Sequence, residues 1–241
     1  MTIYFISDLH LKAANLENTN LFFRFLEKHA LHATAIYILG DFFNIWIGDD
    51  YNTPFIQSIK NALTHLYNNN IPVFFMRGNR DFLIGELALA QMHCISIPDP
   101  YVIELGEEKI LLTHGDLLTT EDKEYRRFRK LVNNPIIQTL FLILPQKIRL
   151  IIASYLRRNS NNVYKKKLQK NPNVFEVSPT VVEAYIKDYK VNGIIHGHTH
   201  FPDFQKFVID NNHYKRIVLG DWGKQAKILA YSDGKYNLIE I

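Results

Sequence analysis

The chain has 241 residues, of which 47% are hydrophobic, so it is long enough to bury a sizeable core and to fold on its own. Its single cysteine, Cys94, excludes an internal disulfide framework and a zinc site built from several thiolates. The formal net charge of +4 is unevenly distributed, because residues 119–170 hold 13 Lys or Arg against 3 Asp or Glu.

The N-terminal stretch "TIYFISDLH" reaches a carboxylate at residue 8 and lacks the basic start and apolar stretch of a signal peptide. We therefore expect this stretch to belong to the fold and the protein to stay in the cytoplasm.

Five short apolar runs rich in Ile, Val, Phe and Tyr predict strands buried on both faces. Helical spacing separates the first three, and Pro54 suits the first turn of the second helix. This alternation predicts an α/β fold with parallel strands and right-handed crossovers, in which the carboxyl ends of the strands meet at one ligand-binding edge. The five runs are residues 3–7, 35–39, 73–76, 110–113 and 193–195.

The basic residues 119–170 fit helices. One apolar face is predicted from Ile148, Ile151, Ile152, Tyr155 and Leu156, with the arginines 149, 157 and 158 off that face. Two interpretations stay open at this point: an interfacial helix on anionic lipid, or a helix packed on the core with its basic side in water. The apolar run 136–144 is too short to span a membrane.

The end of the chain alternates between apolar and polar residues. Residues 214–223 and 226–241, with a turn at 232–234, predict antiparallel hairpins that complete a second sheet.

Oxygen and imidazole side chains close each of the five predicted strands. Such a set without thiolate suits Mn²⁺, Fe²⁺ or Zn²⁺, and seven side chains are too many for one tetrahedral ion. They suit two ions that share a bridging carboxylate. Glycines at 40, 78 and 197 allow a close backbone approach or a positive φ. The seven side chains are Asp8, His10, Asp41, Asn79, His114, His198 and His200.

The ordered motifs D-x-H, G-D, G-N-x-D, H-G-D and G-H-x-H resemble those of the calcineurin-like metallophosphoesterases, over nearly the whole chain outside residues 119–170. The resemblance implies a layered α/β/β/α sandwich with core segments 1–118 and 171–241 and a basic helical lid insertion at 119–170. It also implies two metal sites that share Asp41. One ion is expected on Asp8, His10, Asp41 and His200, and the other on Asp41, Asn79, His114 and His198. His196 is expected behind the ligands or at the substrate.

Arg80 follows Asn79, at a position where many members of the family have a histidine that protonates the leaving group. Arginine cannot deliver a proton, but its fork can bind a phosphate bidentately. Because a phosphate leaving group needs little protonation, Arg80 favours pyrophosphate cleavage over monoester or nucleic-acid diester cleavage.

The stretches "LGDFFNIWIGDD", "GNRDFL", "LLTHGD", "LRRNS" and "IHGHTH" more narrowly resemble the UDP-2,3-diacylglucosamine pyrophosphohydrolases of lipid A synthesis. That resemblance implies cleavage to UMP and 2,3-diacylglucosamine 1-phosphate (lipid X), with Mn²⁺ as the usual metal. It implies catalytic roles for Asp41, Asn79, Arg80 and His198. Substrate contacts are expected at Asn79, Arg80, Asp122, Ser160, Tyr164, Lys167 and His198.

The same resemblance implies that the insertion takes the acyl chains and that its basic residues face phosphates or an anionic membrane, at the cytoplasmic face of the inner membrane. No nucleic-acid or protein partner is expected.

The sequence departs from the family pattern at Asn44, Tyr164 and Phe201. Trp46 is expected in the core or in a pocket wall, Asp49 and Asp50 in a solvated turn. Asp81 and Asp116 are expected to orient the ligands or Arg80.

Two alternative functions are weighed against this one. A metallophosphodiesterase or nuclease would use the basic segment for phosphate affinity, although the segment has an aliphatic face rather than aromatic stacking positions. A non-catalytic scaffold would keep the fold without turnover, and the intact ligand set argues against it.

Overall fold

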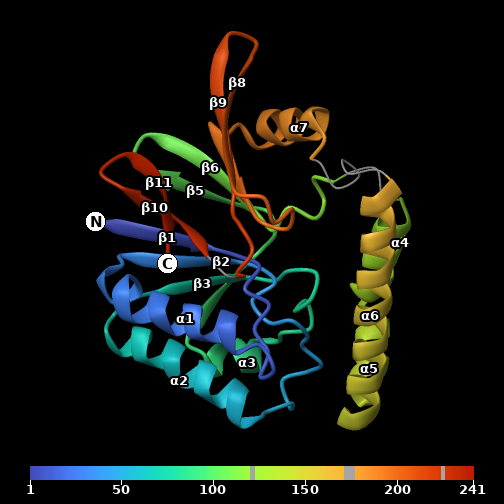
Figure 1. Ribbon diagram of the computed structural model, residues 1–241. Helices are drawn as coiled ribbons and strands as arrows, with labels where there is room; N and C mark the ends of the chain where they lie inside the picture. The colour runs from blue at the N-terminus through green and yellow to red at the C-terminus, as the bar shows by residue number, and fades with distance from the viewer. Residues whose placement is uncertain (120–122, 171–176, 224–225) are drawn as a thin grey trace.

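The computed structural model describes residues 1–119, 123–170, 177–223 and 226–241. Two sheets lie face to face, with helices on both outer sides, and three further helices stand beside them (Figure 1). Within the described helices, nothing is described of the side chains of Lys123, Glu124, Tyr164, Lys165, Lys167, Leu168 and Lys170.

The first sheet has the strand order β11-β10-β1-β2-β3-β4, and its pairs β1–β2, β2–β3 and β3–β4 are parallel, as predicted. Its helices begin at clear caps: the Asn15 side chain accepts a hydrogen bond at the start of α1, and the Thr53 side chain accepts one before Pro54 of α2. The elements are β1 (Thr2–Ile6), α1 (Leu16–Lys28), the short 3₁₀ helix η1 (Ala30–His32), β2 (Ala35–Leu39), α2 (Pro54–Asn68), β3 (Val73–Met76), α3 (Glu86–Gln91), β4 (Cys94–Ile97), β10 (Lys227–Ser232) and β11 (Lys235–Glu240).

The second sheet has the order β5-β6-β7-β9-β8, with β6–β7 and β7–β9 parallel. Helix α7 covers its outer face, and the β8–β9 hairpin extends beyond the rest of the molecule (Figure 1). The elements are β5 (Tyr101–Leu105), β6 (Glu108–Thr113), α7 (Pro179–Tyr189), β7 (Gly193–His196), β8 (Asp203–Ile209) and β9 (Asn212–Val218).

Three apolar clusters separate four layers. One cluster fills the space between the first sheet and α1 to α3, a second lies between the two sheets, and a third lies under α7. Strand β1 shows the pattern: Tyr4 and Ile6 belong to the first cluster, while Phe5 belongs to the second. Because both faces of the strand are buried, its sequence is apolar without alternation. The layered α/β/β/α class predicted from the sequence is confirmed.

The position of the C-terminal hairpin corrects one prediction. Strands β10 and β11 pair with each other and β10 pairs with β1, so the hairpin extends the first sheet and not the second. Leu229 lies in the cluster between the sheets, whereas Ile228 and Ala230 lie in the cluster on the helix side. A strand that serves both clusters must lie in the sheet that divides them. Strand β9 does join the second sheet, as expected.

The basic segment folds into three helices, α4 (Lys123–Val132), α5 (Pro135–Ile143) and α6 (Gln146–Lys170), which stand as a column at one side of the core (Figure 1). The single apolar face predicted for α6 is wrong. Ile152 and Leu156 line a cavity against the core, while Ile151 and Tyr155 are exposed, at 69% and 68%. Arg149, expected off the apolar face, is buried. No helix among the described residues is long and apolar enough to cross a membrane.

Candidate metal centre

The seven predicted ligands come together at the carboxyl ends of five strands. Asp8 and His10 follow β1, Asp41 follows β2, and Asn79 follows β3. His114 follows β6 and the pair His198 and His200 follows β7, so each sheet contributes one side of the site. The convergence that the sequence predicts from parallel topology is therefore what the structure has.

Five of these residues have a left-handed backbone, which is uncommon for residues other than glycine. The φ angles cluster between 51° and 68° at Asp8, His10, Asp41, His198 and His200. Each such residue costs on the order of 1 kcal/mol or more and concentrates at functional sites. The chain therefore bears backbone strain at the positions that aim these side chains inward.

One ligand group is formed by Asp8, His10 and His200. Asp8 Oδ1 lies 3.4 Å from His200 Nε2 and 4.0 Å from His10 Nε2, and the two imidazole nitrogens are 3.3 Å apart. The other oxygen of Asp8 accepts hydrogen bonds from Ser7 Oγ and from the His198 amide, each 2.8 Å long. One oxygen thus fixes the carboxylate, and the other is directed into the site.

A second group lies around Asn79. Asn79 Oδ1 is 2.8 Å from His114 Nε2 and 3.1 Å from His198 Nδ1. Asp41 joins the two groups, because its Oδ1 lies 3.6 Å from His114 Nε2 and its Oδ2 lies 3.8 Å from His10 Nδ1. This placement of its two oxygens is what a bridging carboxylate requires.

The donor atoms fit divalent cations. Among the described residues, Asp8 Oδ1 and His10 Nδ1 are buried without a hydrogen-bond partner, which is costly unless another ligand satisfies them. His114 Nδ1 is 2.9 Å from the carbonyl oxygen of Leu39, so Nε2 is left to face the oxygen of Asn79. In the neutral ring these two acceptors would face each other, and a cation between them would satisfy both.

The electrostatics of the site also favour positive charge. Burial lowers the pKa of His114, but the nearby carboxylates of Asp41 and Asp8 outweigh burial and raise that pKa to about 9. Burial lowers the pKa of His198 to about 3, so this ring is neutral at pH 7 and keeps a lone pair for a metal. Manganese, iron and zinc suit such oxygen and imidazole donors, and the donor set alone does not choose among them.

Glycines permit the close approach of the strand ends. A Cβ on Gly78 would lie 2.3 Å from the amide nitrogen of Asp41. A Cβ on Gly197 would lie 2.4 Å from Asp8 Oδ2, and Gly40 has a φ of +85°. Both uses of glycine that the sequence predicted occur here.

Asp81 supports the ligands from behind. Its buried carboxylate accepts hydrogen bonds from the amides of Gly78 (2.7 Å), Phe42 (2.7 Å), Phe43 (3.2 Å) and Asp41 (3.3 Å). Burial and the charge of Asp41 raise the pKa of Asp81 to about 7, despite these donors. As predicted, Asp81 orients the ligand segments and does not face the ligand cluster itself.

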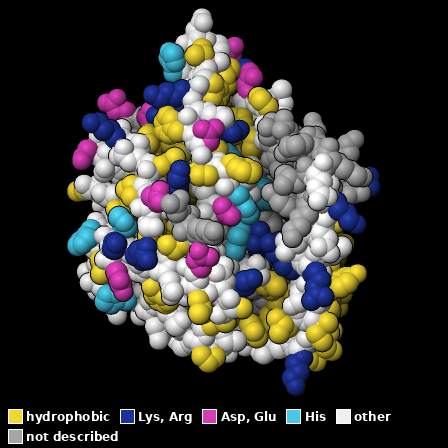
Figure 2. All heavy atoms as spheres, in the orientation of Figure 1, with side chains coloured by type: hydrophobic (Ala, Val, Ile, Leu, Met, Phe, Trp, Pro, Cys, Tyr) yellow, Lys and Arg dark blue, Asp and Glu magenta, His cyan; other side chains and the backbone are white. Residues whose placement is uncertain are grey.

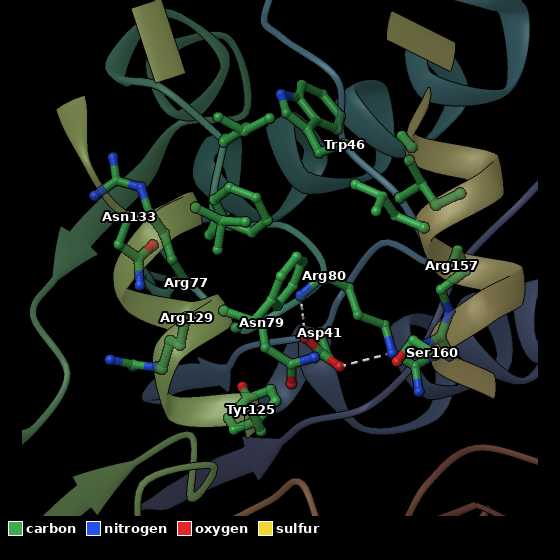
Figure 3. A pocket seen from close by; sticks show the side chains of 18 of the residues that line it. Asp41, Trp46, Arg77, Asn79, Arg80, Tyr125, Arg129, Asn133, Arg157 and Ser160 are labelled. Carbon is green, nitrogen blue, oxygen red and sulfur yellow. Dashed lines mark hydrogen bonds and ion pairs between the residues drawn. The ribbon is translucent and has the colours of Figure 1, made fainter. Parts of the chain in front are cut away.

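Arg80 pairs with the same Asp41. Its amide donates to Asp41 Oδ1 at 2.8 Å, its Nε lies 2.9 Å from Asp41 Oδ2, and Nη1 is 3.5 Å from Asn44 Oδ1 (Figure 3). Arg157 of α6 faces this arginine, and burial together with Arg80 lowers the pKa of Arg157 to about 10. Two guanidinium groups therefore sit beside the ligand cluster.

A cavity of about 1000 Å³ opens from the ligand cluster toward the three insertion helices (Figure 3). Asp41, Asn79, Arg80, His198 and His200 line it on the core side. The insertion contributes an apolar wall, formed by Phe128, Leu131, Val132, Ile137, Phe141, Ile152, Ala153, Leu156 and Val163. A single cavity thus combines a polar centre with a large apolar volume.

Some of the residues predicted to contact substrate line this cavity, and others lie outside the described residues. Asn79, Arg80, Ser160 and His198 line the cavity. Asp122 lies outside the described residues, and the side chains of Tyr164 and Lys167 are likewise outside the description. His196 is completely buried, with Nδ1 2.8 Å from the Gly197 carbonyl oxygen, so of its two expected places only the one behind the ligands agrees with the structure.

Among the lining residues that sequence reasoning missed are Tyr125, Arg129 and Arg157. Of these, only Arg157 had a signal, since it lies one helical turn before Ser160 on the same face of α6. Asp116 contacts Tyr125 and Arg129 of α4, and its charge also contributes to the raised pKa of the ligand His114, so of its two expected partners the ligands agree with the structure.

The pair Asp49 and Asp50 corrects another prediction, because it is not merely a solvated turn. Asp49 accepts hydrogen bonds from the amides of Gly85 and Ala88, each 2.9 Å long, and so caps α3; it also accepts one from Trp46, which lines the cavity as expected. Asp50 forms an ion pair with the buried Arg149, which also donates to the Ile47 carbonyl at 2.6 Å. Arg149 therefore attaches the start of α6 to the core, which is why it is buried.

Similarity to known proteins shows which family the chain belongs to. Residues 1–202 match the family described as calcineurin-like phosphoesterase. A solved archaeal phosphodiesterase has the same fold, with a TM-score of 0.50 at 16% identity over 100% of both chains. This chain therefore belongs to the calcineurin-like phosphoesterase family, as its motifs indicated.

Relatives that are more similar in sequence are all named as one enzyme. The UDP-2,3-diacylglucosamine hydrolase of Serratia proteamaculans is 40% identical over 100% of this chain and 99% of the relative. Those of Proteus mirabilis and Pseudomonas entomophila are each 41% identical, over 100% and 98% of this chain and 99% and 97% of the relatives.

Proposed function

We propose that this protein hydrolyses the pyrophosphate bond of UDP-2,3-diacylglucosamine, releasing UMP and 2,3-diacylglucosamine 1-phosphate (lipid X) for lipid A synthesis. The observation that carries the proposal is the single cavity of about 1000 Å³ that joins the ligand cluster to an apolar wall. Full-length relatives with this activity in their names support the choice of substrate. A nucleotide-lipid fits such a cavity, because its phosphates suit the polar centre and its acyl chains suit the apolar wall.

The proposed centre would hold two divalent ions, with Asp41 as a ligand of both, and Mn²⁺ is the metal that the family resemblance implies. When bound, the ions would neutralise phosphate charge and lower the pKa of an attacking water. Asp8, His10, Asp41 and His200 would hold one ion, and Asp41, Asn79, His114 and His198 the other. The neutral ring of His198 and the unpartnered Asp8 Oδ1 and His10 Nδ1 support these assignments.

Two arginines have proposed roles at the phosphates. Arg80 Nε lies 2.9 Å from Asp41 Oδ2, and its guanidinium could turn to a phosphate and donate hydrogen bonds to two of its oxygens. Arg157, with a pKa of about 10, is charged at neutral pH and adds a second cation from α6. Both would stabilise the charge of the leaving phosphate and need no proton transfer.

In this proposal residues 119–170 form a lid on the core of 1–118 and 171–241. The aliphatic side chains of the lid would surround the acyl chains, while Ser160 contacts the polar part of the substrate. Contacts from Asp122, Tyr164 and Lys167 stay predictions. The wall from the insertion is mainly aliphatic, with Phe128 and Phe141 beside seven aliphatic side chains, which disfavours the alternative nuclease function.

A rate comparison tests the proposal. With Mn²⁺, the native protein is expected to release UMP from UDP-2,3-diacylglucosamine, and a chelator is expected to abolish the release. UDP-N-acetylglucosamine, which lacks the two acyl chains, is the control; we expect its kcat/KM to be lower by at least about 100-fold, because remote apolar binding supports the reaction at phosphorus. Equal rates on both nucleotides would contradict the role of the cavity, and no release from either would contradict the proposed reaction.

The outer side of the insertion supports a second part of the proposal, attachment to the cytoplasmic face of the inner membrane. Hydrophobic side chains gather there with Lys and Arg among them (Figure 2). Ile143 is 73% exposed and Ile151 is 69% exposed. Apolar residues framed by basic ones are typical of helices that lie on an anionic bilayer.

Vesicle binding tests this attachment. Native protein is expected to float with vesicles of anionic and zwitterionic phospholipid, and an Ile143→Asp/Ile151→Asp double variant to bind at least about fivefold less, since it places charge in the apolar layer. Leu16→Asp is the matched control, because Leu16 on α1 is also 69% exposed but lies away from the insertion. Equal loss in the control, or no loss in the double variant, would refute this membrane surface.

A further inference from the structure

Two carboxylates flank the segment that carries His114. Asp99 Oδ1 accepts hydrogen bonds from Thr113 Oγ1 at 2.6 Å and from the His114 amide at 3.3 Å. Asp116 follows His114 by two residues and is only 1% exposed. Together with the bond between His114 Nδ1 and Leu39, these contacts fix the path of the backbone on both sides of a candidate ligand.

Helix α4 of the insertion binds both carboxylates. Arg129 Nε pairs with Asp116 Oδ2, and its Nη2 lies 3.5 Å from Asp99 Oδ2. Tyr125, one helical turn earlier, donates its hydroxyl to the same Asp116 oxygen at 2.7 Å. A guanidinium group holds two carboxylates in a fixed geometry through separate nitrogens of a rigid fork, whereas an ammonium group is a point charge on a flexible stem.

The same helix forms part of the cavity wall through Phe128, Leu131 and Val132. Its position against the core therefore sets the shape of the apolar volume. Two buried carboxylates near each other are unfavourable without a cation between them, and Coulomb repulsion from Asp116 contributes to the raised pKa of Asp99, after burial. Arg129 supplies that positive charge from the insertion side.

We propose that Arg129 is a positioning residue that couples metal binding to the docking of α4. The segment 113–116 has to take one arrangement for His114 to face the ligand cluster and the same arrangement for Asp116 to meet Arg129. A cation that restrains His114 therefore lowers the entropic cost of docking α4, and docked α4 strengthens cation binding by the same factor. The inference rests on the metal centre of the proposed function but not on its lipid substrate.

Hydrogen exchange measures this coupling without any reaction. In the native protein, saturating Mn²⁺ is expected to slow the exchange of the α4 amides at least about fivefold, the lower end of typical coupling factors. In Arg129→Gln the same addition is expected to change α4 exchange less than about twofold. Arg127→Gln is the matched control, an exposed arginine on the same helix, and it is expected to keep the native response.

Arg129→Lys separates geometry from charge. Lysine keeps the positive charge but provides a point donor in place of the fork, so we expect the Mn²⁺ effect on α4 to stay below about threefold. A native response in Arg129→Lys or in Arg129→Gln would overturn the positioning role. The lysine variant also keeps the test decisive if the glutamine variant does not fold.

Calorimetric titration with Mn²⁺ alone distinguishes the two levels of the proposal. Native protein that binds Mn²⁺ without any change in α4 exchange would overturn the coupling and leave the metal centre standing. Native protein that does not bind Mn²⁺ would overturn both. We expect Mn²⁺ to bind at least about fivefold more weakly to Arg129→Gln than to the native protein, by reciprocity.

Discussion

An Asp41→Asn variant is expected to lose nearly all metal-dependent hydrolysis while staying folded. Each oxygen of Asp41 faces a different ligand group, at 3.8 Å from His10 Nδ1 and 3.6 Å from His114 Nε2. Asparagine has the same size but presents an NH₂ group on one side, which has no lone pair for a cation. It also removes the charge that Arg80 contacts. We expect UMP release to fall at least about 1000-fold, as when a principal electrostatic group is removed.

Initial rates with saturating Mn²⁺ and a Mn²⁺ titration check this result. Asp188→Asn is the control, because Asp188 is an exposed carboxylate on α7, away from the ligand cluster. The melting temperature without metal is expected to change little, since Asp41 is a buried carboxylate whose pKa burial raises. Activity within tenfold of native at saturating Mn²⁺ would rule out the bridging role.

The ligand cluster could be predicted from the sequence because its geometry follows from topology. Parallel strands joined by helices place their carboxyl ends along one edge, so polar residues that follow each apolar run must meet. Asp8 and Asn79 are 71 residues apart in the chain, yet both are found there. The glycine positions followed from the same reasoning, because a crowded edge needs residues without a Cβ.

The hairpin β10–β11 could not be assigned to its sheet from the sequence. Strand β10 has a continuous apolar run from Ile228 to Tyr231, unlike the alternation expected for the hairpin, and such a run shows only that both faces of a strand are buried. Which sheet it joins depends on pairing with β1, a contact across more than 200 residues. The register between distant strands leaves no local signal.

The contacts that attach the insertion to the core could not be predicted from the sequence either. Arg129 and Arg149 look like the other basic residues of their helices, and basic residues usually lie in solvent. Their roles depend on carboxylates elsewhere, Asp116 and Asp50, which the fold brings beside them. A single long-range ion pair has no periodicity, so a sequence pattern cannot reveal it.

A Gly78→Ala variant is expected to lose both stability and metal affinity. The added Cβ would lie 2.3 Å from the Asp41 amide nitrogen and 2.4 Å from Asp41 Oδ1, and neither atom belongs to a flexible chain end. Asp41 cannot move away freely, because its amide and those of the next two residues bond Asp81. Such overpacking costs about 2–3 kcal/mol, and any relief has to displace the bridging carboxylate.

Denaturant unfolding and a Mn²⁺ titration measure the two losses in the same preparations. Gly223→Ala is the matched control, since a Cβ there meets no atom within 4 Å. We expect the control to stay within about 0.5 kcal/mol of native, and Gly78→Ala to bind Mn²⁺ at least about tenfold more weakly. A stable Gly78→Ala protein with native Mn²⁺ affinity would mean that the Asp41 amide nitrogen lies farther from position 78 than the 2.3 Å found for an added Cβ. The bridging geometry of Asp41 would then have to be abandoned. A variant that loses stability but keeps native Mn²⁺ affinity would instead show that Asp41 can be displaced without weakening metal binding. Only a loss of both stability and Mn²⁺ affinity supports a site whose metal geometry requires that residue 78 has no Cβ.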